Sequence, residues 1–300
     1  MKTPMADDVK DKLARLLAGK AAGQLPGAAA KQISAGQPIY QRPAEQLGNL
    51  RVIYITDGTV SMSSYIDAVQ RVIKDVGTHV LSAEQKIEAA AMLFDEHKGS
   101  SFTPALIRNL QYATGRRGIV HSDFLQTNEF TSNATTLEQQ VAGLVRADIG
   151  NGSNDEPYEC AAKYLVDLIT EDHKTNPNRK YAVVMFGDEQ PHGIYGSQAC
   201  PHGVSPQELR TLATLANRSF WVDCDPHRGE GPFRLGTYEQ ARDIETATYL
   251  KFKDAAPILK EALIGMVEQT KGASAYASFL TQLPAATASS VKGLLGNGKN

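Results

Sequence analysis

The sequence has few cysteines and lacks both a long apolar run and an apolar N-terminus. Its three cysteines, Cys160, Cys200 and Cys224, are an odd and widely spaced set, which argues against a disulfide framework and favours a reducing compartment. No apolar run approaches the roughly 20 residues that a membrane-spanning helix needs. The first residues, MKTPMADDVKDKL, contain no apolar stretch of the kind found in signal peptides. We therefore expect a cytoplasmic protein without a membrane span.

The chain also lacks an excess of charge of either sign. It carries 31 Lys and Arg against 33 Asp and Glu, a net charge of −2 at pH 7. This balance excludes the basic character typical of proteins that bind nucleic acids, so we expect no nucleic-acid partner. With 42% hydrophobic residues among 300, the chain is long and apolar enough to bury an ordinary core.

Both ends of the chain differ in composition from its middle. Residues 1–48 begin with a helical pattern of apolar residues and continue rich in Ala, Gly, Pro and Gln, which predicts an amphipathic helix and a linker arm. Residues 271–300 predict a C-terminal tail with a few anchoring apolar residues. These arms either dock on the chain's own surface or bind a partner, including a second copy in an oligomer. The middle, residues 49–270, predicts one domain.

Strand and helix patterns alternate through this middle. Continuous apolar runs are typical of strands buried on both faces of a parallel sheet, and they are RVIYIT, KIEAAAMLF, KYAVVMF, SFWVD and the shorter TYLKF. Residues 118–131 predict a further strand at an antiparallel edge. Helical patterns separate these runs, over residues 64–76, 136–145, 157–170, 206–216, 238–245 and 255–267. The alternation predicts an α/β fold with a doubly wound, mostly parallel sheet flanked by helices.

Small oxygen-bearing side chains follow the first predicted strand. Asp57, Thr59 and Ser61 occupy alternate positions where this strand gives way to a helix. A carboxylate with hydroxyls is a ligand set for hard cations such as Mg²⁺, Mn²⁺ or Ca²⁺. The same residues also suit a structural role, because Thr59 or Ser61 can cap the helix and Asp57 can form an Asx turn. This stretch alone leaves both interpretations open.

Two further loops favour the metal interpretation. Asp188 comes just after another predicted buried strand, and the Gly-rich loop GNGSNDEP carries Ser153 and Asp155. The carboxyl ends of parallel strands meet at one edge of a sheet, where such folds bind their ligands. The sequence therefore predicts that three loops deliver oxygen ligands to the same edge.

These motifs resemble those of the von Willebrand factor type A family, the fold of integrin I domains, with its metal-ion-dependent adhesion site. The family's first motif, Asp-x-Ser-x-Ser, resembles Asp57-Gly-Thr59-Val-Ser61, where Thr replaces the first Ser and keeps its hydroxyl. The family's last motif, an Asp followed closely by Pro, resembles Asp188 and Pro191 with the intervening Gly replaced by Glu. The resemblance covers residues 51–269.

The middle motif matches less closely. Asp155-Glu-Pro157 resembles the Asp-x-Pro-Glu run of integrin β-type domains, but Tyr158 stands where that run has its metal-binding Glu. Ser153 and Glu159 are therefore alternatives to Asp155 as the middle ligand. The resemblance implies a bound Mg²⁺, or Mn²⁺ or Ca²⁺ in its place, with these ligands: Asp57, Thr59, Ser61, Asp155 and Asp188.

In the family, the cation keeps a coordination position for a carboxylate of a partner protein. Neutral hydroxyl ligands leave the ion with positive charge, which attracts an acidic side chain through a charge-assisted contact. We therefore expect a metal-dependent protein–protein interaction module, not an enzyme. It would bind Asp or Glu of a protein partner within a bacterial or phage assembly.

Two other functions stay open. A cation beside Asp188, Glu189 and His192 suits a metal-dependent hydrolase or phosphotransferase, although the sequence has no P-loop and no Gly-x-Ser-x-Gly motif. Tyr158 in place of the middle Glu suits instead a structural component with a degenerate metal site.

Thiols and imidazoles gather in two further loops. One loop contains Cys200 and His202, and the other contains Cys224 and His227. Both follow neighbouring predicted strands, and Cys and His are the usual ligands of Zn²⁺. Their spacing matches no standard zinc finger, so ordinary loop residues are the alternative to a second, zinc-type site. Cys160 is expected as a small buried residue of a helix.

Overall fold

The computed structural model describes residues 49–59, 61–62, 65–81, 86–95, 119–122, 125–144, 155–193, 199–224 and 243–296. All of these residues belong to one compact unit, Leu47–Asn300. The N-terminal helix and linker arm, residues 1–48, lie outside the described residues and stay a prediction, as does most of the helix expected over 238–245.

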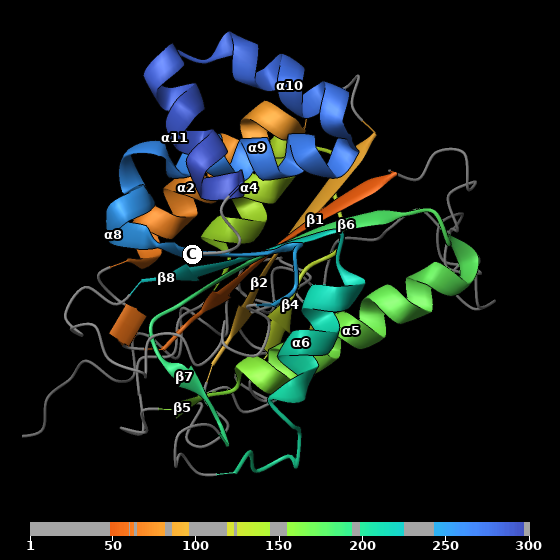
Figure 1. Cartoon of the computed structure of the whole chain (residues 1–300). Helices are drawn as coiled ribbons and strands as arrows, with labels where there is room; N and C mark the ends of the chain where they lie inside the picture. The colour runs from red at the N-terminus through yellow and green to blue at the C-terminus, as the bar shows by residue number, and fades with distance from the viewer. Residues whose placement is uncertain are drawn as a thin grey trace, which may run out of the picture. The chain divides into compact units, whose positions relative to one another are not determined.

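A seven-stranded, mostly parallel sheet forms the centre of this unit, in the order β3-β4-β2-β1-β6-β8-β9 (Figure 1). The strands from β2 to β9 in this order run parallel, whereas β4 pairs antiparallel with both β2 and β3. The strand bounds are β1 Leu50–Asp57, β2 Ile87–Phe94, β3 Ile119–Ser122, β4 Leu125–Thr127, β6 Lys180–Gly187, β8 Arg218–Asp223 and β9 Ala247–Lys251. The predicted mixed α/β fold, its mostly parallel sheet and its antiparallel edge are confirmed.

Alternation along the strands gives the sheet two apolar faces. In β1, Val52 and Tyr54 pack in one buried cluster, while Ile53 and Ile55 pack in another, as expected for side chains that alternate across a strand. Each fully buried Val or Ile contributes roughly 1.5–3 kcal/mol, so a strand that is apolar on both sides is held at the centre of the fold.

Helices supply the residues that cover these two faces, and Figure 1 draws the two groups on opposite sides of the sheet. The helices of the Val52 face are α2 (Ile66–Val80), α4 (Ala134–Ala142) and α9 (Leu259–Lys271). The helices of the Ile53 face are α5 (Tyr158–Thr175) and α6 (Gln207–Leu215).

Two more helices lie in the segment expected as a C-terminal tail. They are α10 (Ala273–Gln282) and α11 (Ala285–Gly296), and both contact α9. Phe279 and Val291 are the buried residues of these helices. They pack around Gly265 of α9, where an added Cβ would lie 2.9 Å from the side chain of Leu295. The apolar residues of this segment therefore attach two whole helices to α9, because Gly265 lets these helices approach closely.

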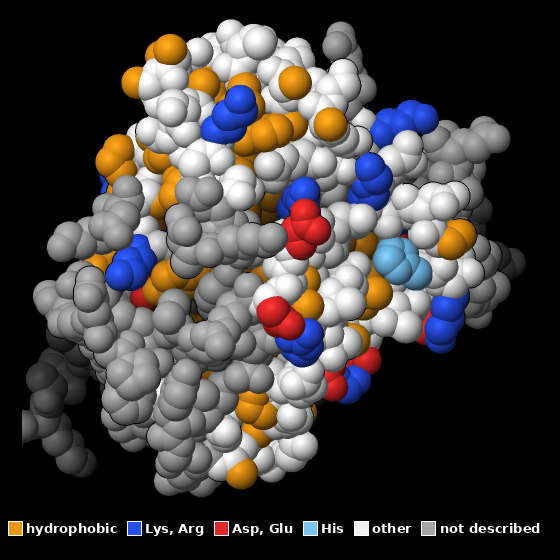
Figure 2. Space-filling view, in the orientation of Figure 1, with side chains coloured by type: hydrophobic (Ala, Val, Ile, Leu, Met, Phe, Trp, Pro, Cys, Tyr) orange, Lys and Arg blue, Asp and Glu red, His pale blue; other side chains and the backbone are white. Residues whose placement is uncertain are grey.

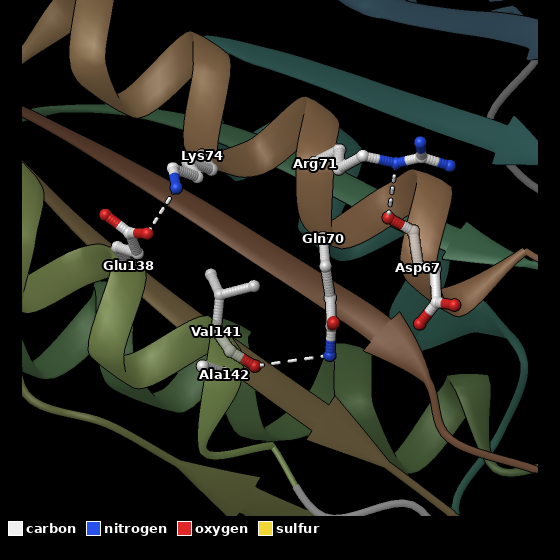
Figure 3. A pocket seen from close by; sticks show the side chains of 7 residues that line it. All are labelled: Asp67, Gln70, Arg71, Lys74, Glu138, Val141 and Ala142. Carbon is white, nitrogen blue, oxygen red and sulfur yellow. Dashed lines mark hydrogen bonds and ion pairs between the residues drawn. The ribbon is translucent and has the colours of Figure 1, made fainter.

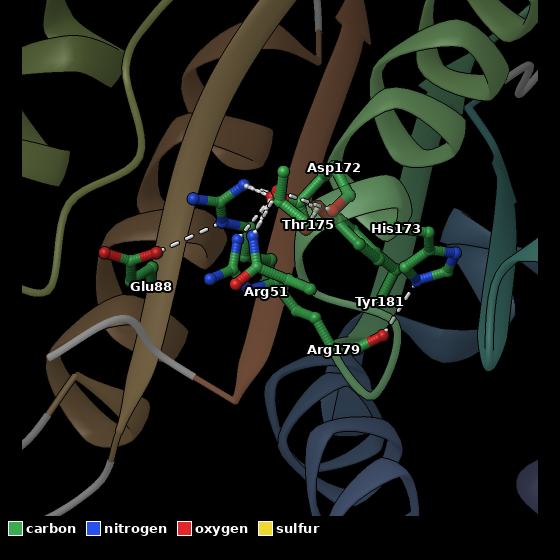
Figure 4. Close-up of polar contacts among 8 residues, drawn as sticks. Arg51, Glu88, Asp172, His173, Thr175, Arg179 and Tyr181 are labelled. Carbon is green, nitrogen blue, oxygen red and sulfur yellow. Dashed lines mark hydrogen bonds and ion pairs between the residues drawn. The ribbon is translucent and has the colours of Figure 1, made fainter. Parts of the chain in front are cut away.

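A group of charged side chains lies at the amino ends of the central strands (Figure 4). Arg51 of β1 donates from Nε to Glu88 of β2 at 3.1 Å and from Nη1 to Asp172 of α5 at 3.2 Å. Asp172 also accepts from Nη1 of Arg179 at 2.5 Å and from the hydroxyl of Tyr181 at 2.7 Å. We call these five residues the amino-edge network. It joins the last turns of α5 to three strands of the sheet.

No helix among the described residues is long and apolar enough to span a membrane. On the face drawn in Figure 2, the described Lys and Arg side chains lie singly or beside Asp and Glu, and they form no basic patch there.

The order of strands reverses at the centre of the sheet. β2 lies on one side of β1 and β6 lies on the other, so the chain adds strands first in one direction and then in the opposite one. In open α/β sheets, ligands bind beyond the carboxyl ends of the two strands at such a reversal. Asp57 ends β1 and Asp188 directly follows β6, so both stand at this position.

Candidate functional site

Four neighbouring parallel strands each have an aspartate at their carboxyl end. Asp57 and Asp223 are the last residues of β1 and β8, and Asp95 and Asp188 come directly after β2 and β6. Because these strands pair in parallel register, the four residues lie along one edge of the sheet, which we call the carboxyl edge. Sequence analysis missed Asp95 and Asp223, although each follows an apolar run as Asp57 does.

At the centre of this edge, four of the predicted ligands are in contact. Thr59 Oγ1 lies 2.9 Å from Ser61 Oγ, and Ser61 Oγ donates to Asp188 Oδ1 at 3.0 Å. The backbone N–H of Thr59 donates to Asp57 Oδ1 at 2.8 Å. The structure therefore brings together side chains from two loops that are far apart in the sequence. We call Asp57, Thr59, Ser61 and Asp188 the oxygen cluster.

The oxygen cluster is buried on one side and open on the other. Asp57 and Thr59 are 0% and 2% exposed, whereas Ser61 is exposed and Asp188 is half-buried. The second carboxylate oxygen of Asp57, Oδ2, is buried and has no hydrogen-bond partner within the described part of the chain. Burying such an oxygen without a donor is unfavourable, and a divalent cation would compensate it. The residues present therefore fit a hard cation.

Electrostatic interactions in the oxygen cluster also favour a bound cation. Burial raises the pKa of Asp57 well above its ordinary value, and the nearby carboxylates of Asp188 and Asp95 raise it further, against the hydrogen bonds from Thr59. A cation at this point would oppose both causes, because its charge favours the ionised form of each carboxyl group.

Tyr158, which stands where the resemblance has a metal-binding Glu, lies beside the oxygen cluster. Its ring packs edge-on against Phe94 with the centroids 4.8 Å apart. Burial raises the pKa of its hydroxyl, and the charges of Asp57 and Asp188 add to this effect. The hydroxyl meets Gly187, where an added Cβ would lie 1.7 Å from it. Gly187 is therefore required for a neutral, buried phenol to occupy this position.

One of the two structural alternatives is also present. The hydrogen bond from the Thr59 N–H to Asp57 Oδ1 is that of an Asx turn. The expected helix cap is absent, because α2 begins after Tyr65 and the side chain of Tyr65 makes no capping bond. The Asx turn uses only one oxygen of Asp57, so it is compatible with a ligand role for Oδ2.

Two candidates for the middle ligand belong to the Gly-rich loop. Ser153 lies outside the described residues, and only the backbone of Asp155 is described. This backbone forms the short strand β5 (Asp155–Glu156), which pairs in parallel with β7 (Gln190–Pro191). The end of the Gly-rich loop therefore lies beside the loop that follows Asp188, as the resemblance implies.

The third candidate, Glu159, belongs to a different group at the start of α5. Glu159 Oε1 lies 2.9 Å from His192 Nδ1, and Oε2 accepts from the His192 backbone N–H at 3.3 Å. With Cys200 these residues form a group whose potential ligand atoms all lie within 4.8 Å of one another. Cys160 Sγ lies 3.4 Å from Cys200 Sγ and 3.9 Å from Glu159 Oε1. We call Glu159, Cys160, His192 and Cys200, all of them buried, the thiol cluster.

The four residues expected to form a second, zinc-type site are not brought together as a set. Cys200 lies in the thiol cluster, with His202 close by, since His202 Nδ1 is 4.0 Å from Cys160 Sγ. Cys224 directly follows β8 and packs on the opposite face of the sheet from Cys200. His227 lies outside the described residues. The sheet itself therefore separates the two cysteines of the predicted set.

A groove of about 470 Å³ lies between α2 and α4 and contains none of the predicted ligands (Figure 3). Lys74 of α2 pairs with Glu138 of α4, and Gln70 donates to the Val141 carbonyl at 3.4 Å. One ion pair and one neutral hydrogen bond therefore bridge the two surface helices across this groove.

Comparison with known proteins finds a distant structural likeness. No family model matches the sequence, and no curated protein matches it either. The fold is similar to that of the pilus adhesin SpaC from Lactobacillus rhamnosus GG in an open conformation, with a TM-score of 0.46 and 10% sequence identity. The match covers 73% of this chain and 30% of the SpaC chain. A likeness at this level carries no argument about family or function, which depend on the residues described above.

Proposed function

We propose that the chain is a metal-dependent protein–protein interaction module. A divalent cation, Mg²⁺, Mn²⁺ or Ca²⁺, would be held by the oxygen cluster and would bind an Asp or Glu of a partner protein. The supporting observation is the convergence of Asp57, Thr59, Ser61 and Asp188 where the strand order reverses. The order of the motifs and the helices on both faces lead us to assign the chain to the doubly wound von Willebrand factor A fold.

Each residue of the oxygen cluster has its own part in this proposal. Asp57 would bind the cation through Oδ2 and supply the buried negative charge. Thr59 and Ser61 would add neutral hydroxyl oxygens, and Asp188, half-buried and bonded to Ser61, would add a second carboxylate. When bound, the cation supplies positive charge on the side of exposed Ser61, where an acidic side chain can approach from solvent.

We propose binding in preference to catalysis. His192, the base that a hydrolase at this edge would use, is 8% exposed, and its Nδ1 is engaged by the buried Glu159. A proton-transfer group must reach a substrate, and this imidazole belongs to another cluster. The bacterial or phage assembly, the cytoplasmic location and an oligomer through the terminal arms stay predictions from the sequence.

Calorimetric titration with Mg²⁺, Mn²⁺ and Ca²⁺ tests the cation step. The wild-type chain should bind at least one of these ions, and Asp57→Ala or Asp188→Ala should weaken binding by about 10-fold or more, because each removes a charged ligand. Asp167→Ala is the matched control, since Asp167 is exposed on α5 and pairs with Lys163. Absence of binding to all three ions would overturn the proposal and favour a degenerate site.

The carboxylate step is tested with protein loaded with Mn²⁺. Acetate should displace water from the bound ion and lower its enhancement of water-proton relaxation, whereas the neutral isostere acetamide should not. The Asp57→Ala variant under the same conditions reports the effect of free Mn²⁺. An equal response to acetate and acetamide would contradict a position reserved for an acidic side chain.

A further inference from the structure

The thiol cluster is a second set of potential metal ligands that the proposed function does not use. It joins three segments: Glu159 and Cys160 in the first turn of α5, His192 after β7, and Cys200 before α6. All four side chains are buried, and Glu159 is 0% exposed. A carboxylate, an imidazole and two thiols thus meet away from solvent.

Hydrogen bonding accounts for only part of this arrangement. Glu159 and His192 already satisfy each other through the Nδ1 and backbone N–H contacts, which is enough to bury a carboxylate. Cys200 also hydrogen-bonds to Glu159 and to the backbone N–H groups of His202 and Val204, although a thiol is a weak hydrogen-bonding group. As metal ligands, in contrast, all four groups are of the types found at zinc sites.

The separations of three of these groups suit one bound ion. With Zn–S near 2.3 Å and Zn–N or Zn–O near 2.0 Å, ligand atoms at the corners of a tetrahedron lie roughly 3.3–3.8 Å apart. The separations here are 2.9 Å from Glu159 Oε1 to His192 Nδ1, 3.4 Å between the two Sγ atoms, and 3.9 Å from Cys160 Sγ to Glu159 Oε1. Glu159, His192 and Cys200 offer ligand atoms that all lie within 4.8 Å of one another, whereas Cys160 lies beside Cys200 and does not belong to this set.

We propose that Glu159, His192 and Cys200 form a structural site for a zinc-type divalent cation, with Cys160 beside Cys200. Thiolate and imidazole ligands select Zn²⁺ over Mg²⁺ or Ca²⁺. On binding, the Cys200 thiol releases its proton to solvent, and no change of oxidation state is involved. The site is independent of the oxygen cluster, which offers only oxygen ligands.

The consequence for the fold is a staple between α5 and the segment that follows Asp188. His192 lies four positions after Asp188, and Cys200 lies at the start of the segment that leads into α6. A metal bound to both, and to the first turn of α5, would fix the β7 segment beside the carboxyl edge. Loss of the metal is therefore expected to lower the melting temperature.

Replacement of the metal by Co²⁺ tests the site, because tetrahedral cobalt–thiolate centres have a near-ultraviolet charge-transfer band and strong visible bands. Chelator-treated, reduced wild-type chain should acquire both bands at one Co²⁺ per chain and lose them on addition of Zn²⁺. Cys200→Ser should weaken Co²⁺ binding by about 100-fold or more and abolish the charge-transfer band, whereas Cys160→Ser should retain the band. Wild-type protein without these bands would overturn the proposal.

Two control variants make the result specific. Cys224→Ser removes the remaining cysteine, which packs on the other face of the sheet, and should leave the cobalt spectrum unchanged. Asp57→Ala should also leave it unchanged, so failure of the oxygen cluster to bind a cation remains distinguishable from failure of this site. If Cys200→Ser does not fold, reagent titration of the wild-type thiols decides, since Zn²⁺ should protect Cys200. A Cys160–Cys200 disulfide in place of bound metal, found by mass spectrometry, would contradict the proposal.

Discussion

Charged side chains are arranged in opposite ways at the two ends of the central strands. They are paired with opposite charges at the amino end and clustered with like charges at the carboxyl end. At the amino end, the Asp172 carboxylate accepts hydrogen bonds from two arginines and a tyrosine within the amino-edge network. At the carboxyl end, Asp57 is surrounded by like charge, since Asp188 and Asp95 both raise its pKa. The same strand, β1, carries Arg51 near its start and Asp57 at its end.

The charged side chains at the amino ends of the strands therefore stabilise the fold, whereas those at the carboxyl ends are available to a ligand. Paired charges at the amino end offset the desolvation of each buried group and attach α5 to the sheet. Clustered carboxylates at the carboxyl end raise the free energy of the folded chain until a cation compensates them. Replacing an aspartate by asparagine should therefore lower the free energy of unfolding at the amino end and raise it at the carboxyl end.

The largest expected effect is at the amino end, with Asp172→Asn. Removing this charge leaves Arg179, whose side chain is 3% exposed, without its carboxylate, and the free energy of unfolding should fall by about 3 kcal/mol. Urea unfolding followed by the fluorescence of Trp221, the single and buried tryptophan, measures the change. Asp167→Asn on the same helix is the control and should change the value by less than about 1 kcal/mol, because its pair with Lys163 is exposed.

A smaller effect of opposite sign is expected for Asp57→Asn in the presence of EDTA. The substitution keeps the oxygen that accepts from the Thr59 N–H and removes a buried negative charge next to Asp188. The free energy of unfolding at pH 7 should therefore rise by about 1 kcal/mol. Mg²⁺ or Mn²⁺ should stabilise the wild type and leave the variant unchanged. If the variant is less stable than the wild type in EDTA, the proposed difference between the stabilising amino end and the destabilising carboxyl end is wrong.

Much of the fold was predictable because its strands are buried on both faces. The runs that form β1, β2, β6 and β8 are apolar without interruption, and such runs identify strands of a parallel sheet. Helix bounds were less predictable. The helix expected over residues 255–267 begins later, as α9 at Leu259, because Pro257 lacks a backbone donor and sits in the short 3₁₀ turn η4 (Ala256–Ile258) after α8 (Phe252–Ala255).

The oxygen cluster was predictable for a similar reason. Asp57, Thr59 and Ser61 are close in sequence, and topology alone brings Asp188 to the same edge. The thiol cluster was not predictable, because its members follow no ligand spacing and depend on how α5 packs against the loops around it. Sequence alone could not reveal that Cys200 would lie beside Cys160 and Cys224 on the other face.

The last effect concerns Tyr181 of the amino-edge network and depends on pH. Burial raises its pKa to about 12, with the bond to Asp172 adding to this and Arg51 opposing it, whereas an unfolded tyrosine ionises near pH 10. Between these values the folded chain keeps a proton that the unfolded chain has lost, so the free energy of unfolding falls as pH rises through this window. Tyr181→Phe removes this titration, and its stability should fall less steeply between pH 10 and 12 than that of the wild type. At pH 7 the variant should lose about 1 kcal/mol, because the 2.7 Å hydrogen bond to Asp172 is gone. Urea unfolding followed by circular dichroism across this range measures both effects, and parallel curves for the two proteins would show that Tyr181 does not contribute to the alkaline loss of stability.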